Sequence, residues 1–286
     1  MRFAAKRQAR WTSYRDVGAG ARRQLLFGRG SVEVIRLGQG EPIVLVPGLA
    51  GGWKLLAPLA RRLAQRHEVI LYGLRGDRGP TATDRAETVA DYASDLAALC
   101  DGLALERPAV FGVSFGAAVA LELAVEQPNR IGSLIVQGVE ARFRGGLGAR
   151  IALQALERFP LPSDNRFLNQ FFNLLHGGRP EPGPLTDFVV ERCWETDQGV
   201  MARRLRALES FDVGDRLWRI DVPTLVLAGT RDAIVPPAGQ HSLAASISGA
   251  RLTTLDGAGH IAFLTHRADV ARHVRSHFRA ARRALR

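Results

Sequence analysis

Residues 112–116 read Gly-Val-Ser-Phe-Gly and place one serine, Ser114, between two glycines. The pattern G-x-S-x-G predicts a sharp turn from a strand into a helix, with the serine exposed at the turn as a nucleophile. The apolar run 109–113 favours a buried strand before Ser114, and the alanine-rich run 117–125 favours a helix after it. Because five residues match easily in a chain with 30 glycines, the strand–turn–helix context carries the prediction.

A serine hydroxyl becomes a good nucleophile when a base takes its proton, and an acid has to orient that base. After Ser114, the chain offers one candidate for each role. Asp232 follows the apolar run 222–228, and His260 follows the run 252–255. Sites in open α/β sheets form at the carboxyl ends of the strands, so we expect the three side chains to meet there. Such a group predicts attack on an activated carbonyl.

Strand-like and helix-like runs alternate along most of the chain. Strand-like runs lie at 42–46, 68–72, 109–113, 131–136, 222–228 and 252–255, and the run at 42–46 is a continuous apolar one typical of a parallel strand buried on both faces. Helical spacing is found at 53–65, 87–103, 117–125, near 239–247 and at the C-terminus. This alternation predicts an α/β fold with a doubly wound, mostly parallel sheet.

Residues 140–212 interrupt the alternation with helical segments, no good strand and five of the 14 prolines. We interpret them as a helical cap inserted into an α/β core that comprises 22–139 and 213–286. Residues 1–21 have no clear periodicity and are interpreted as an N-terminal extension.

An apolar helical stripe within the cap includes Phe171 and Phe172. We expect part of this stripe to pack on the core and part to face Ser114. Phe171 and Phe172 are therefore predicted to line an apolar pocket for the acyl group of a substrate.

The motifs together resemble the α/β-hydrolase superfamily of serine hydrolases with a helical cap. The resemblance runs from about residue 22 to the C-terminus. Four short segments carry it: the turn at 112–116, Val-Pro-Gly-Leu at 46–49, Gly-Thr-Arg-Asp at 229–232, and Gly259-His260. The resemblance implies the α/β-hydrolase fold and a catalytic triad of Ser114, His260 and Asp232.

The resemblance also implies an oxyanion hole formed by the backbone N–H groups of Leu49 and Phe115. Pro47 stands where many members have histidine, which leaves the Leu49 N–H in place but removes a supporting hydrogen bond. Some members carry the acid directly after the sixth strand, so Glu140 is an alternative to Asp232.

We expect a hydrolase that acts on carboxylic esters of small molecules through an acyl-enzyme intermediate. The alternatives are a thioesterase, an acyltransferase or a non-catalytic binding protein with the same fold. No cluster of His, Cys and Asp has metal-ligand spacing, and nucleotide phosphate-binding patterns are missing. We therefore expect neither a metal nor another cofactor.

The formal charge of +11 raises the question of an anionic partner. Apart from Lys6 and Lys54, every basic residue is arginine, which is more typical of a coding bias than of a selected surface patch. We expect solvated helix faces and no nucleic-acid partner. Two distant cysteines, Cys100 and Cys193, and the lack of a signal peptide or membrane span favour the cytoplasm.

Overall fold

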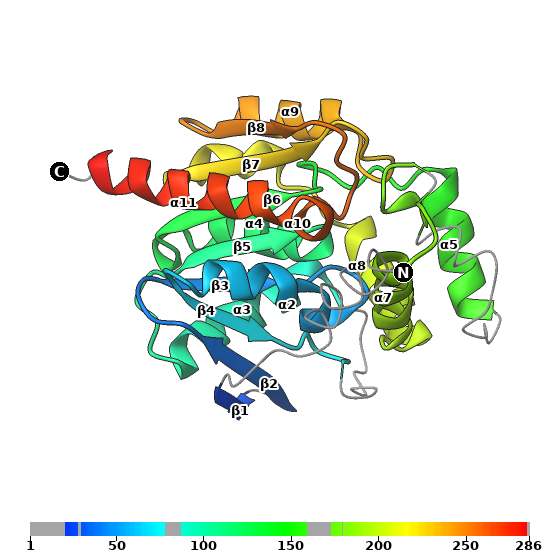
Figure 1. The fold of residues 1–286 in the computed structure, drawn as a ribbon, viewed down its shortest axis with the longest axis horizontal. Helices are drawn as coiled ribbons and strands as arrows, with labels where there is room; N and C mark the ends of the chain where they lie inside the picture. The colour runs from blue at the N-terminus through cyan, green and yellow to red at the C-terminus, as the bar shows by residue number, and fades with distance from the viewer. Residues whose placement is uncertain (1–20, 28–29, 78–86, 159–172, 179, 285–286) are drawn as a thin grey trace, which may run out of the picture.

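The computed structural model describes residues 21–27, 30–77, 87–158, 173–178 and 180–284. Its centre is an eight-stranded sheet with the strand order β1-β2-β4-β3-β5-β6-β7-β8, which is stacked from bottom to top in Figure 1. The strands are β1 (Ala21–Phe27), β2 (Gly30–Leu37), β3 (Pro42–Val46), β4 (Glu68–Tyr72), β5 (Ala109–Val113), β6 (Ser133–Gln137), β7 (Thr224–Gly229) and β8 (Arg251–Leu255). β1 and β2 form an antiparallel hairpin, β2 is antiparallel to β4, and the remaining pairs are parallel.

Helices cover both faces of the sheet, as the predicted doubly wound fold requires (Figure 1). One face packs against α2 (Gly52–Leu63), α10 (Ala262–Thr265) and α11 (Arg267–Ala284). The other face packs against α3 (Val89–Gly102), α4 (Phe115–Glu126) and α9 (Pro237–Ser246). Successive side chains of a strand point to opposite faces, so Leu45 enters the first cluster and Val44 and Val46 enter the second.

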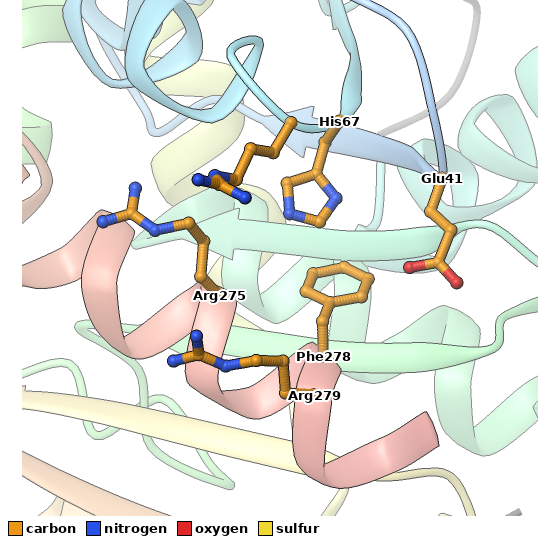
Figure 2. Close-up of a pocket in the computed structure, with 6 residues that line it drawn as sticks. Glu41, His67, Arg275, Phe278 and Arg279 are labelled. Atoms are coloured by element: carbon orange, nitrogen blue, oxygen red, sulfur yellow. The ribbon is translucent and has the colours of Figure 1, made fainter. Parts of the chain in front are cut away.

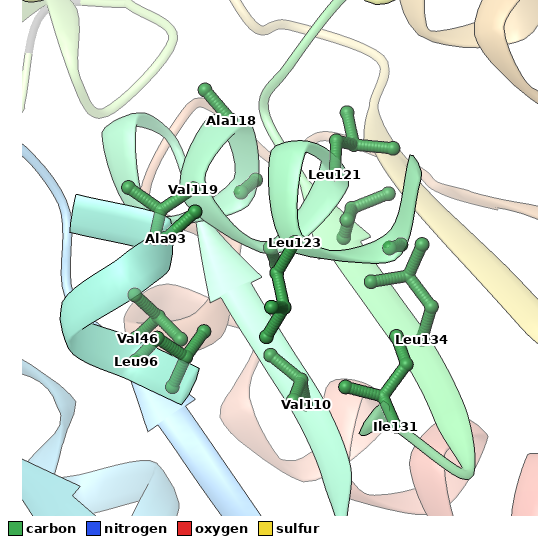
Figure 3. Close-up of a cluster of buried hydrophobic side chains, with 14 of the residues drawn as sticks. Val46, Ala93, Leu96, Val110, Ala118, Val119, Leu121, Leu123, Ile131 and Leu134 are labelled. Carbon is green, nitrogen blue, oxygen red and sulfur yellow. The ribbon is translucent and has the colours of Figure 1, made fainter. Parts of the chain in front are cut away.

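Helix α4 lies at the centre of the second cluster (Figure 3). Every residue from Phe115 to Val125 is buried, and the many alanines allow the helix to approach the sheet closely. Figure 3 shows Leu123 of α4 pointing toward Val110 of β5. The core thus holds α4 tightly behind the strand that precedes Ser114.

Three described α-helices lie between β6 and β7, beyond one end of the strands at the right of Figure 1. They are α5 (Leu147–Arg158), α7 (Pro184–Trp194) and α8 (Gln198–Glu209). A short antiparallel bridge joins Arg142 to Asp212, so the chain enters and leaves this insertion at neighbouring positions. The bridge lies close to the predicted cap boundaries of 140 and 212.

Cys100 and Cys193 are both free and buried. Burial raises the pKa of Cys100 to about 11 and that of Cys193 to about 12. Both thiols therefore act as small apolar core residues. Within the described part of the chain, none of the helices combines the length and apolar content that a membrane crossing needs.

A buried histidine, His277, makes the stability of the fold depend on pH. His277 of α11 is 2% exposed, and its Nε2 lies 2.7 Å from the Ser133 hydroxyl at the start of β6. Burial and, after it, the nearby charge of Arg251 lower the pKa of His277 from 6.5 to about 4. A hydrogen bond to the backbone of Pro223 acts in the opposite direction but does not compensate.

The unfolded chain binds this proton more tightly than the folded chain, so the stability from neutral His277 is complete above about pH 6.5. It is lost as the pH falls toward 4. Between pH 7 and pH 5 we expect the group to remove about 2 kcal/mol from the free energy of unfolding. Urea unfolding at several pH values should give a flatter pH dependence for His277→Gln than for the wild type. His241→Gln, at an exposed position of α9, serves as the control, and equal slopes for His277→Gln and the wild type would contradict the assignment.

Candidate active site

Ser114 lies at the turn between β5 and α4, as the sequence predicts. Its backbone has φ 51° and ψ −119°, a combination that non-glycine residues rarely adopt. The Ser114 N–H donates to the carbonyl of Gln137 at the end of β6, 2.8 Å away. The Ser114 carbonyl accepts from Ala117 and Ala118 in the first turn of α4. These bonds hold the strained residue in place.

The two glycines of the motif are required by close backbone contacts. A Cβ at Gly112 would lie 2.3 Å from the carbonyl oxygen of Gly116. A Cβ at Gly116 would lie 2.3 Å from the carbonyl oxygen of Val46 and 2.4 Å from that of Pro47. These atoms are backbone and cannot rotate away, so the turn accepts no side chain at either glycine.

Asp232 and His260 form a buried pair. His260 Nδ1 lies 2.9 Å from Oδ2 and 3.1 Å from Oδ1 of Asp232, and the two residues are 4% and 5% exposed. Asp232 Oδ1 also accepts the backbone N–H groups of Ile234 and Val235, at 3.0 and 2.9 Å. With its Nδ1–H donated to Asp232, His260 would keep Nε2 free to accept a proton.

The Asp232 carboxylate is stabilised in its charged form. Burial alone would raise the pKa of Asp232, but the charge and hydrogen bond of His260 act against it. The N–H groups of Val235 and Ile234 add to this effect, and the net result is a pKa below the ordinary value. Asp232 is therefore ionised at neutral pH, as a group that orients a histidine must be.

Two buried glutamines support the pair. Gln240 donates to Asp232 Oδ2 and to the Val235 carbonyl at 3.2 and 2.8 Å, and it accepts the Gly138 N–H at 3.1 Å. Gln137 donates to the His260 carbonyl at 2.8 Å. Sequence reasoning did not identify either glutamine, because nothing in the local pattern distinguishes them from other polar residues.

The end of β6 brings Ser114 and His260 to the same place. Gln137 accepts the Ser114 N–H, and a Cβ on the next residue, Gly138, would lie 2.7 Å from His260 Cε1. Within the described part of the chain, no hydrogen bond joins the Ser114 hydroxyl to His260. Catalytic hydrogen bonds are often long without substrate and shorten when it binds.

The predicted oxyanion donors belong to the residue after Ser114 and to a residue of the neighbouring loop after β3. Phe115 is the first residue of α4, where N–H groups have no partner inside the helix. Leu49 follows Gly48, at which a Cβ would lie 3.6 Å from the Ser114 Cβ. Glu140, the alternative acid, instead lies against Gly239 of α9, and Asp232 is the carboxylate that contacts His260.

Phe171 and Phe172 lie outside the described residues, so their assignment to a substrate pocket stays a prediction. The end of the same apolar stripe is described. Leu175 packs on the core, its carbonyl accepts the Ile261 N–H at 3.1 Å, and Leu174 is 48% exposed.

A separate pocket of about 330 Å³ lies away from these residues (Figure 2). Its lining residues are Glu41, Arg66, His67, Arg275, Phe278 and Arg279. Glu41 and His67 directly precede β3 and β4, whereas Ser114 directly follows β5. Because these three strands are parallel, the pocket lies at their N-terminal ends, whereas Ser114 lies at their C-terminal ends.

Comparison with known proteins shows the family of the chain. The sequence pattern of the alpha/beta hydrolase family matches residues 43–273. The chain belongs to this family. The match includes Ser114, Asp232 and His260, and within the described residues no group of three or more His, Cys, Asp and Glu could hold a metal ion.

Several relatives of this α/β hydrolase are named as hydrolases. The chain is 31% identical over 243 residues to pimeloyl-[acyl-carrier protein] methyl ester esterase of Stenotrophomonas maltophilia, with 82% of this chain and 91% of that protein covered. It is 29% identical over 251 residues to RutD of Variovorax paradoxus, which is named as a carbamate hydrolase, with 80% and 88% covered. It is also 30% identical over 278 residues to polyketide synthase ThaQ of Burkholderia thailandensis, with 93% of this chain covered but only 13% of that protein.

Solved structures share the fold. A thermophilic esterase from Thermogutta terrifontis matches with a TM-score of 0.77 and 25% identity, covering 91% of this chain and 99% of that chain. The enol-lactonase from Burkholderia xenovorans matches with a TM-score of 0.80 and 23% identity, covering 90% and 99%. The predicted α/β-hydrolase fold is therefore confirmed.

The backbone strain at Ser114 can be measured without any substrate. Glycine adopts a positive φ freely, whereas alanine keeps the strain of about 1 to 3 kcal/mol that such a residue stores. We expect Ser114→Gly to be more stable than Ser114→Ala by about 1 kcal/mol, although glycine usually destabilises the ordered elements it enters. Chemical unfolding of both variants tests this, and a more stable alanine variant would show that the turn is unstrained.

Proposed function

We propose that this α/β hydrolase cleaves carboxylic esters of small molecules, with Ser114 as nucleophile, His260 as base and Asp232 as the acid that orients it. The observation that carries the proposal is the buried Asp232–His260 pair, held by the end of β6 beside a serine in nucleophile-elbow geometry. The esterase names of a relative and of a solved structure support the choice of substrate class.

In the proposed reaction, the Ser114 oxygen attacks the ester carbonyl while His260 Nε2 takes the hydroxyl proton. The negative charge that forms on the carbonyl oxygen is stabilised by the N–H groups of Phe115 and Leu49. His260 then returns the proton to the leaving alcohol, which leaves an acyl group on Ser114. Water, deprotonated by His260, releases the acid and restores the serine.

Other reactions could use the same groups. A thioesterase or acyltransferase would also form the acyl-enzyme, and the name of RutD adds carbamates as a possible class. A binding protein without catalysis would leave Ser114 unreactive. Labelling with an alkyl fluorophosphonate tests reactivity, and p-nitrophenyl esters, coenzyme A thioesters and carbamates of matched acyl chain separate the classes.

A cytoplasmic location is also part of the proposal. Cys100 and Cys193 are buried free thiols, as expected where thiols stay reduced. The predicted apolar pocket near Phe171 and Phe172 would select the acyl chain by its length, with up to about 0.8 kcal/mol for each buried methylene.

Removal of the nucleophile gives a direct test. Ser114→Ala should lower kcat for p-nitrophenyl butyrate by about 10⁴- to 10⁶-fold, because the covalent step is lost while the fold remains. The same variant should no longer take up the fluorophosphonate label, and its circular dichroism should match the wild type. Ester hydrolysis at the wild-type rate by purified Ser114→Ala would disprove the assignment.

The acid is tested by two matched substitutions. Asp232→Asn should lower kcat by at least about 10³-fold, because an amide can donate to Nδ1 and stabilise the wrong histidine tautomer. Glu140→Gln should have a far smaller effect, since Glu140 lies against Gly239 and not against His260. If the two effects were reversed, the acid would be Glu140.

A further inference from the structure

Arg204 of α8 is fully buried and reaches from the cap into the core. Its Nη1 donates to the Leu49 carbonyl at 3.0 Å. Its Nη2 donates to the Arg75 carbonyl at 3.0 Å and pairs with Asp77 Oδ1 at 2.6 Å. A buried charge needs such partners to be tolerated. The guanidinium therefore ties α8 to two loops that follow strands of the core, one after β3 and one after β4.

A second cap residue contacts the loop after β3. Thr196 follows α7, is 4% exposed, and accepts the Gly51 N–H with its hydroxyl oxygen at 3.0 Å. Thr196 and Gly51 lie far apart in the sequence, so this contact forms only because the inserted helices fold over the loop after β3. Two different side chains of the cap thus bond to adjacent backbone groups of one loop.

These contacts act next to the Leu49 N–H. Peptide groups are planar, so fixing the Leu49 carbonyl and the Gly51 N–H fixes the two peptide planes directly after Leu49. On the N-terminal side of Leu49, the Pro47 carbonyl oxygen packs against Gly116, where an added Cβ would lie 2.4 Å from it. The loop is thereby held on both sides of the peptide group that carries the Leu49 N–H.

We propose that Arg204 and Thr196 are positioning residues, through which the cap aims the Leu49 N–H at the oxyanion that forms on Ser114. This inference rests on the proposed function, because an oxyanion forms only if Ser114 attacks a carbonyl. Donors of this kind act only when they are held in place before the reaction, and losing one costs about 10²- to 10³-fold in kcat. The cap therefore contributes to the rate of turnover as well as covering the substrate.

The test uses two substitutions and matched controls. Arg204→Met keeps much of the side-chain volume but removes every donor, and Thr196→Val keeps the shape but removes the hydroxyl. Thr196→Ser restores the hydroxyl and serves as the conservative variant. Arg206→Met is the control on the same helix, because Arg206 pairs with Glu157 of α5 inside the cap and does not contact the loop.

Titration with a fluorophosphonate to completion first counts the intact sites in each preparation, so that misfolded protein does not lower the measured kcat. With p-nitrophenyl butyrate, we expect kcat per site to fall about 10- to 100-fold in Arg204→Met and Thr196→Val, with KM changed by less than about threefold. The Ki of a trifluoromethyl ketone should rise by a similar factor, because its adduct carries the oxyanion. Thr196→Ser and Arg206→Met should behave as the wild type.

Wild-type kcat per site and wild-type Ki in both substituted variants would overturn the inference and leave Arg204 and Thr196 with a structural role. If Arg204→Met does not fold, the comparison of Thr196→Val with Thr196→Ser decides, and equal kcat values in that pair overturn it. A wild-type protein that neither takes up the label nor hydrolyses any ester would instead refute the proposed function.

Discussion

The close approach of α4 to the ends of β3 and β5 is the constraint on which the site depends. Gly112 and Gly116 have no room for a side chain, since Val46, Pro47 and the first turn of α4 already fill that space. With both neighbours fixed, Ser114 is forced into a positive φ at the end of a buried strand. The strain is sustained because the buried faces of α4 and the sheet contribute far more stability than one residue can remove.

A buried charge is the second constraint. Removing Asp232 from water disfavours its carboxylate, and this unfavourable effect is offset by His260 and by two backbone N–H groups. The carboxylate and the imidazole therefore depend on each other, and neither has an equivalent partner if the other is lost. Gln240 closes this arrangement by bonding both to Asp232 and to Gly138, against which the His260 ring packs.

The features that the sequence predicted are those with local causes. Parallel strands buried on both faces give continuous apolar runs, so β3, β4 and β5 were predicted with their observed bounds. The strand expected from residue 131 begins instead at Ser133. Ile131 is buried like a strand residue, but the hydrogen-bonded pairing with β5 starts only at Ser133. The turn at Ser114 was predictable because the two glycines that it requires lie within the same five consecutive residues.

The positions of Arg204 and Gln240 could not be predicted in this way. Their partners are fixed by tertiary contacts, and a buried arginine looks the same in the sequence as the many arginines on the surface. Asp77, the ion-pair partner of Arg204, likewise has no local sequence feature that separates it from other charged residues. Polar residues that support a site are defined by what lies around them after folding, and local propensity carries no information about that.

Different elements of the fold hold different residues of the candidate site. Rigid strands and α4 fix Ser114, whereas Leu49 and His260 lie on loops that need further support. The cap bonds to both loops, through Arg204 and Thr196 at one and through the Leu175 carbonyl at the other, where Ile261 follows His260. A cap that only covered the substrate would need none of these bonds to backbone groups. In the proposed mechanism, its attachment to both loops means that the insertion completes the geometry around Ser114 together with the sheet.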